Sequence, residues 1–112
     1  MIWVKQNKYG NEKTVVDGIT FDSRKEASRY QELKMLEKAG EIVGLNRQLR
    51  IELIPKTRLY RACYYVADFV YFDKKEKKTV YEDVKGGKYR TKEYLIKRKL
   101  LYWRHGIEIK ET

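Results

Sequence analysis

The sequence predicts an α/β domain in which a central mixed β-sheet is flanked by two main helices. Apolar and polar residues alternate over residues 49–53, and residues 64–72 and 79–84 are rich in β-branched and aromatic residues, which predicts strands. Apolar residues recur at helical spacing over residues 24–39 and 92–105, which predicts two helices. The predicted order is hairpin, helix, strand, hairpin, helix, strand.

Length and composition indicate a single domain over residues 1–112, with residues 1–13 as a flexible arm. The chain is 42% hydrophobic and 13% aromatic, which is too apolar for a disordered protein. It has no apolar run of membrane-spanning length. Cys63 is the only cysteine, so no internal disulfide is expected, and the chain fits a reducing cytoplasm. One cysteine and one histidine cannot build a structural zinc site.

The first third of the chain predicts a tight hairpin followed by a helix. An Asp-Gly pair lies between the apolar runs of residues 14–21, and both turn positions of such a hairpin favour positive φ. Ser23 is a good N-cap, and Glu26 three residues later completes a capping box for a helix over residues 24–39. Glu26 then has two interpretations. It is either a cap without chemistry or a carboxylate aimed at the later hairpin.

The second hairpin, over residues 64–85, holds the candidate chemistry. Asp68 is an acid within an apolar run, which is costly unless it is paired, binds a metal or lies near water. Strand alternation places Asp83 and Lys85 on one face of the second arm and Glu82 on the other. We expect Asp68, Asp83 and Lys85 to converge on a metal-dependent site. The simpler alternative is a cross-strand ion pair, because an acid two residues before a lysine is common in charged proteins.

The remaining elements are a half-buried strand within residues 44–55, the second helix and a short edge strand over residues 107–110. Thr91 is expected to cap the second helix. The apolar stripe of that helix is expected to hold Ile96, Leu100 and Trp103.

Positive charge dominates the protein, with 26 Lys and Arg against 16 Asp and Glu and a net charge of +10. Residues 85–104 hold eight basic residues against the single acid Glu93. A clustered basic segment is typical of proteins that bind a phosphate backbone, although a solvated basic face would look the same. The expected DNA contacts are Lys88, Arg90, Lys92, Lys97, Arg98 and Arg104.

Two or three carboxylates and a lysine in a basic protein suggest metal-assisted hydrolysis of phosphodiesters. Carboxylate oxygens suit the hard cations Mg²⁺ and Mn²⁺. Such a cation polarises the phosphate and lowers the pKa of an attacking water. Lys85 would then position the water or stabilise the developing negative charge.

Several short motifs together carry a family resemblance that covers nearly the whole chain. They are NKYG at 7–10, DGITFDS at 17–23, Glu26, Ala27, Arg29, Tyr30, Leu33, ADF at 67–69 and EDVKG at 82–86. With these residues the chain resembles the PD-(D/E)xK nuclease superfamily. More closely, it is similar to a family of small phage-encoded proteins, domain of unknown function 1064, that is assigned to that superfamily.

The resemblance implies a restriction-endonuclease-like core of helix, three-stranded meander, helix and strand. It implies Asp68 and Asp83 as metal ligands, Lys85 as the catalytic lysine and Glu26 as the acid on the helix, which would be a third metal ligand. Ala67 stands where the superfamily motif has a proline, but that proline is not a ligand. The resemblance also suggests that Gln48 lies near the site, the alternative being an ordinary glutamine on an exposed strand face.

The implied function is a Mg²⁺- or Mn²⁺-dependent DNA endonuclease, structure-selective in the manner of Holliday-junction resolvases. It would act in phage recombination or replication, in the cytoplasm of a bacterial host, and a homodimer is a further expectation. Two alternatives stay open. One is a non-catalytic nucleic-acid-binding module that keeps the fold, and the other is a small interaction protein whose basic helix binds an acidic partner.

Overall fold

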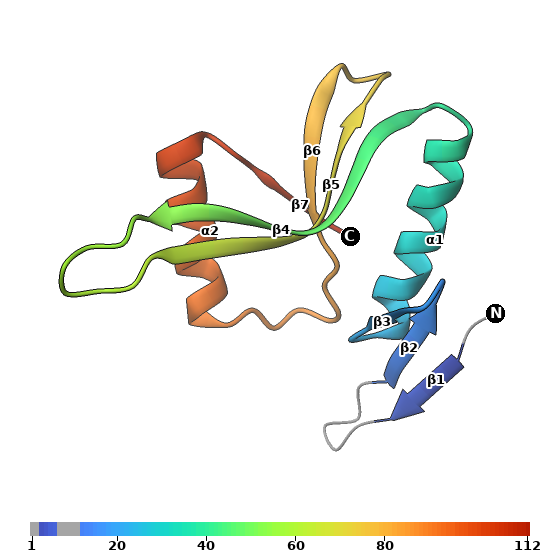
Figure 1. Ribbon diagram of the computed structural model, residues 1–112, viewed down its shortest axis with the longest axis horizontal. Coiled ribbons are helices and arrows are strands. Elements are labelled where there is room, and N and C mark those ends of the chain that lie inside the picture. Colours follow the sequence, from blue (N-terminus) through green and yellow to red (C-terminus); the bar gives the residue numbers. More distant parts are fainter. Residues whose placement is uncertain (1–2, 7–11) are drawn as a thin grey trace.

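The computed structural model describes residues 3–6 and 12–112, which form seven strands and two helices (Figure 1). In chain order these are β1 (Trp3–Gln6), β2 (Glu12–Val16), β3 (Ile19–Phe21), α1 (Arg24–Lys38), β4 (Ile42–Ile54), β5 (Cys63–Asp73), β6 (Lys78–Asp83), α2 (Lys92–His105) and β7 (Ile109–Glu111). The predicted α/β class and the two helices are confirmed, and the predicted element order is confirmed from β2 onward, with β1 as an additional strand.

The larger sheet has four strands in the order β4-β5-β6-β7. The first three form an antiparallel meander, and β7 pairs parallel to β6 after the chain has passed through α2. A mixed sheet is therefore present, and β7 is the edge strand expected at the end of the chain. β6 pairs only with residues 69–73 of β5, so the first half of β5 has β4 as its one strand neighbour among the described residues.

The smaller sheet is antiparallel, in the order β1-β2-β3. The predicted Asp-Gly turn is confirmed, because Asp17 has a φ of 52° and Gly18 a φ of 76°. Within the stretch expected to be a flexible arm, residues 3–6 form the strand β1. Residues 3–6 pair with residues 12–15, and this pairing satisfies their backbone N–H and C=O groups. A mainly polar sequence gives no sign of such pairing. Residues 1–2 and 7–11 lie outside the described residues.

Helix α1 begins as predicted, since the side chain of Ser23 accepts a hydrogen bond from the backbone N–H of Glu26 at 3.1 Å. It packs Ala27, Tyr30 and Leu33 against the strands. Within the described residues, no helix combines the length and apolar character needed to span a membrane.

Helix α2 begins at the predicted cap, Thr91, whose hydroxyl accepts from the N–H of Tyr94 at 3.0 Å. The predicted apolar stripe is wrong for two of its three residues, because Ile96 is 58% exposed and Trp103 is 81% exposed. Leu100, the third residue, packs against the core. Leu101, which the stripe did not include, is fully buried there, and Tyr94 also packs against this core.

The β4–β5 hairpin bends in the middle, as Figure 1 shows. Tyr65 and Ala67 belong to the core beneath α2, whereas Phe69 and Tyr71 belong to the core beneath α1. In a regular strand all four residues would share one face. Opposite the switch, Gln48 of β4 has a φ of 52°, an uncommon conformation for a residue with a side chain. Asp68 therefore lies at the point where the hairpin changes direction.

Candidate active site

Asp68 and Asp83 are joined directly across β5 and β6. The backbone N–H of Asp68 donates to Oδ1 of Asp83 at 3.1 Å, and the N–H of Val84 donates to Oδ2 of Asp68 at 2.9 Å. Asp83 is 3% exposed, and the hydroxyl of Tyr65 donates to its Oδ2. Burial raises the pKa of Asp83 to about 6, against the lowering effects of the Asp68 amide and of Lys85. The two predicted acids thus share one network at the end of the meander.

Glu26 reaches this network through Gln48. The amide of Gln48 donates to Oε1 of Glu26 at 3.3 Å and to Oδ1 of Asp68 at 3.2 Å. Only the Ser23 half of the predicted capping box is seen among the described hydrogen bonds, and the Glu26 carboxylate points to Gln48 instead. Burial, followed by the charge of Asp68, raises the pKa of Glu26 to about 7. Gln48 was expected either near the site or as an ordinary glutamine on an exposed strand face. It is exposed, and its amide lies beside the acids.

Glu82 lies on the opposite face of β6 and makes a separate ion pair. Its carboxylate is fully buried and accepts two hydrogen bonds from the guanidinium of Arg29, at 2.8 and 2.7 Å. Tyr71 also donates to it. Burial alone would raise the pKa of Glu82, but these hydrogen bonds outweigh burial and hold its pKa below the usual value. The alternation predicted for Glu82 and Asp83 is therefore present in the fold.

Lys85 lines a cavity of about 260 Å³ together with Asp68 and Asp83. Its ammonium lies 4.0 Å from the ring centroid of Tyr94, a cation–π contact across the mouth of the cavity. Lys97 of α2 also lines it. The predicted lysine and the two aspartates therefore meet at one concave surface.

The three acids do not form a finished metal-binding cage. Among residues 3–6 and 12–112, no three acidic, histidine or cysteine side chains are arranged so that they would hold an ion as they stand. The amide of Gln48 lies between Glu26 and Asp68, and the oxygens of Asp83 already accept protein donors. The donor chemistry suits Mg²⁺ or Mn²⁺, since all three groups are carboxylates, but binding requires that some of these hydrogen bonds be exchanged for contacts to the ion.

Four of the six predicted DNA contacts are engaged in ion pairs. Arg90 and Arg98 both pair with Glu111 at 3.0 Å, Lys97 pairs with Glu93, and Arg104 pairs with Glu52. Arg90 lies before the helix, so it shares no helical face with Lys97 and Arg104, although the three recur every seven residues. Lys88 and Lys92 are exposed and appear in none of the described ion pairs.

The structure adds two supports that the sequence analysis did not identify. The first is Tyr65, whose hydroxyl donates to the Asp83 carboxylate. The second is Thr112, whose N–H donates to the Asp83 carbonyl at 2.9 Å and whose carbonyl accepts from the Lys85 N–H at 3.0 Å. A tyrosine in a buried strand needs a hydrogen-bond partner for its hydroxyl, so a polar partner for Tyr65 could have been expected from the sequence. Nothing in the sequence pattern marks Thr112.

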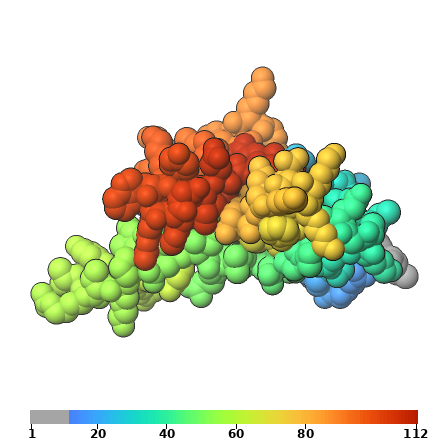
Figure 2. All heavy atoms as spheres, turned by 90° about the horizontal axis from the view of Figure 1, so that it is seen from above, coloured from blue at the N-terminus to red at the C-terminus, as the bar shows by residue number. Residues whose placement is uncertain are grey.

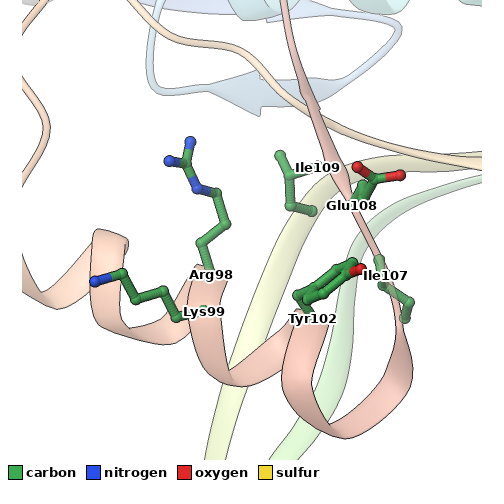
Figure 3. Close-up of a pocket in the computed structure, with 6 residues that line it drawn as sticks. All are labelled: Arg98, Lys99, Tyr102, Ile107, Glu108 and Ile109. Atoms are coloured by element: carbon green, nitrogen blue, oxygen red, sulfur yellow. The ribbon is translucent and has the colours of Figure 1, made fainter.

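A larger hollow of about 520 Å³ lies between α2 and β7, away from the acids (Figure 3). The residues that line it are Arg98, Lys99, Tyr102, Ile107, Glu108 and Ile109. None of the candidate catalytic residues belongs to it, and the guanidinium of Arg98 is directed to Glu111. We therefore place the candidate active site at the smaller cavity.

Fold and site together define an α/β protein with a buried aspartate, a half-buried aspartate and a lysine at the end of its central meander. Comparison with protein families matches residues 6–112 to a family described as "Protein of unknown function (DUF1064)". The chain belongs to this family, as its motifs predicted. No curated protein and no solved structure gives a significant match.

Proposed function

We propose that this protein is a metal-dependent DNA endonuclease built on a PD-(D/E)xK core. The observation that carries the proposal is the direct link between Asp68 and Asp83, which brings two carboxylates and Lys85 to one cavity. The order of α1, the β4-β5-β6 meander, α2 and β7 is the order that such a core requires. Glu26 on α1 lies one amide group away from Asp68, which supports it as the third acid.

Asp68, Asp83 and Glu26 would hold Mg²⁺ or Mn²⁺. When bound, the ion would polarise the scissile phosphate and lower the pKa of a nearby water. Lys85 lines the cavity with the acids, where its ammonium would donate to a phosphate oxygen and offset developing negative charge. Hydrolysis forms a bond between the water oxygen and phosphorus and breaks the bond to the leaving sugar oxygen, which gains a proton.

The net charge of +10 supports DNA as the substrate, because a polyanion is attracted to the whole molecule. Lys88 and Lys92 are exposed and lie close in sequence to Lys85 and Thr91, which line the cavity, so they can approach phosphates. Phosphate contacts position a protein without reading sequence, so we propose recognition of DNA shape, as in a junction resolvase of phage recombination or replication. A homodimer would supply two such sites for the two strands.

A second candidate is a non-catalytic module that binds nucleic acid with the same fold. The observation that favours it is the set of protein hydrogen bonds that already engage the oxygens of Asp83 and Asp68. In that case the acids would stabilise the bend of the hairpin and would bind no ion. DNA binding would then be independent of divalent metal.

A cleavage assay separates the two candidates. Purified protein is incubated with four-way junction, flap, duplex and single-stranded DNA, each with Mg²⁺, Mn²⁺ or a chelator. We expect metal-dependent cutting that Asp83→Asn abolishes and that Glu76→Gln, an exposed acid in the turn of the same hairpin, leaves unchanged. Binding without cutting on every substrate would favour the non-catalytic module. Cutting that survives in Asp83→Asn would contradict the assigned site.

A further inference from the structure

The β4–β5 hairpin ends in an exposed connection that no function described so far uses. We call residues 55–62, between β4 and β5, the hairpin tip. Figure 1 shows the hairpin running out beyond α2, and Figure 2 shows its end as a separate lobe at the surface. Residues 55–61 are all exposed.

The tip combines two apolar side chains with positive charge. Leu59 is 68% exposed and Tyr60 is 73% exposed. The tip also carries Lys56, Arg58 and Arg61 and no acidic residue. Single exposed apolar residues are common on protein surfaces, but an adjacent leucine and tyrosine among three cations offer both a stacking surface and phosphate contacts.

The tip is an ordered turn. The N–H of Thr57 donates to the carbonyl of Tyr60 at 2.9 Å, and the N–H of Tyr60 donates back to the Thr57 hydroxyl at 2.9 Å. These bonds use the backbone of Tyr60 and leave its ring free. A side chain presented on a fixed turn loses little conformational entropy when it binds.

A row of exposed and half-buried side chains connects the tip to the candidate active site. Tyr64, Val66 and Asp68 alternate along β5, and all three line the cavity that holds Asp83. Tyr64 also carries the guanidinium of Arg50 at 4.1 Å from its ring centroid. Tyr60 and Asp68 are separated by eight positions, at most roughly 28 Å of extended chain.

We propose that the hairpin tip inserts into DNA at a branch, with Tyr60 stacking on an unpaired base and Leu59 wedging the neighbouring step. Apolar side chains that enter base steps unstack and kink DNA, and the cost is lowest where bases are already unpaired. The basic residues around them would hold the flanking phosphates. This inference rests on the proposed DNA substrate and specifies it as branched DNA with an unpaired base within about eight base pairs of the cut, at 3.4 Å per pair.

The test measures binding and unstacking without cleavage. Full-length protein in chelator is titrated into a four-way junction with 2-aminopurine at the branch and into the matching fully paired duplex. We expect wild type to raise the 2-aminopurine fluorescence of the junction and to prefer the junction over the duplex. Leu59→Ala/Tyr60→Ala should lose the fluorescence rise and bind the junction at least about 5-fold more weakly, the low end for loss of one stacked base.

Two control variants distinguish stacking from a general loss of surface or fold. Met35→Ala removes a 71% exposed apolar side chain from α1 and should behave as wild type. Tyr60→Phe keeps the ring and should retain the fluorescence rise. The proposal is overturned if the double variant matches wild type in both measurements, or if wild type raises no fluorescence at the branch.

The result is separable from that of the nuclease proposal. A protein that shows tip-dependent unstacking but cuts nothing would keep this inference and contradict the enzyme. Metal-dependent cutting lost in Asp83→Asn, together with a tip variant that binds and unstacks as wild type does, would keep the enzyme and contradict the tip.

Discussion

Glu82 and Asp83 are neighbours in the chain, yet their carboxylates lie on opposite faces of β6 and bond to different layers of the protein. Glu82 faces α1 and pairs with Arg29, whereas Asp83 bonds to Tyr65 and to the backbone of Asp68. Strand alternation produces this separation directly. Glu82 therefore has a structural role, whereas the adjacent Asp83 belongs to the candidate active site.

Replacing each acid by its amide should therefore change stability to different extents. Glu82→Gln removes the buried counter-charge of Arg29 and leaves only the exposed Glu32 as its acidic partner, so we expect a loss of about 3 kcal/mol in the free energy of unfolding. Asp83→Asn should cost less than about 1 kcal/mol, because burial already disfavours the charged form of Asp83. Urea denaturation checks both variants. Equal losses of stability would contradict the division of roles. Cleavage should be lost in both variants, in Glu82→Gln because the protein misfolds and in Asp83→Asn although it stays folded.

The left-handed backbone of Gln48 allows its amide to be tested apart from its conformation. Glycine adopts a φ of 52° without strain, whereas alanine does not. Gln48→Gly should therefore be more stable than Gln48→Ala by about 1 kcal/mol in the free energy of unfolding. Both variants remove the bonds to Glu26 and Asp68, so cleavage should fall equally in both. Cleavage that follows stability instead would mean that the amide itself contributes nothing.

Divalent metal should stabilise the folded protein through the three acids. An ion that binds only the folded state raises stability by about 2.7 kcal/mol at 100 times its dissociation constant. We expect the melting temperature of wild type and of Glu76→Gln to rise with Mg²⁺ or Mn²⁺ concentration, and that of Asp83→Asn to stay constant. Differential scanning calorimetry in chelator and in each metal measures this. A similar rise in all three proteins would place the ion elsewhere.

Acid stability should depend on Glu111. Hydrogen bonds from Arg90 and Tyr94 hold its pKa at about 2, below the usual 4.5, so the folded protein binds a proton at Glu111 less readily than the unfolded chain. Its contribution is fully present above about pH 5 and is lost as the pH falls from there to about 2. Glu111→Gln should flatten that part of the stability curve, measured by thermal melting between pH 2 and 7. An unchanged curve would show that the cluster with Arg90 and Arg98 adds no stability.

The salt dependence of DNA binding should report on two exposed lysines, Lys88 before α2 and Lys92 at its first position. If Lys88 and Lys92 each contact one phosphate, Lys88→Ala/Lys92→Ala should reduce the slope of log affinity against log salt by about 2. Lys74→Ala/Lys75→Ala in the turn of the β5–β6 hairpin removes the same charge from another surface and should leave the slope unchanged. Equal changes would indicate general attraction by net charge rather than contacts at these positions.

Local patterns predicted most of the fold correctly. The Asp-Gly turn, the Ser23 and Thr91 caps and the alternation of β5 and β6 each depend on neighbours in sequence, and each is present. Strand β1 was missed because its partner, not its composition, makes it a strand. The outward orientation of Trp103 could not be predicted from spacing, since α2 has two apolar faces and the one that holds Leu101 packs against the core.

Within the candidate site, the sequence located the four residues but not their contacts. Asp68 and Asp83 meet because their strands pair, which the hairpin pattern implied. The position of Gln48 between Glu26 and Asp68 depends on a bend and a positive φ that no residue type announces. The same is true of the ion pairs that engage Arg90, Arg98 and Arg104, because their partners come from distant strands. The pair between Lys97 and Glu93 is different, since its i,i+4 spacing on the predicted helix is visible in the sequence.

The two backbone hydrogen bonds of Thr112, to Asp83 and from Lys85, link the backbone around Val84 to the last strand. β7 is synthesised after β5, β6 and α2, and its docking on β6 fixes the backbone on both sides of Val84. Pairing between strands so far apart along the chain is the slow part of folding. The position of Lys85 beside Asp83 therefore depends on a strand that is distant in sequence and comes after α2.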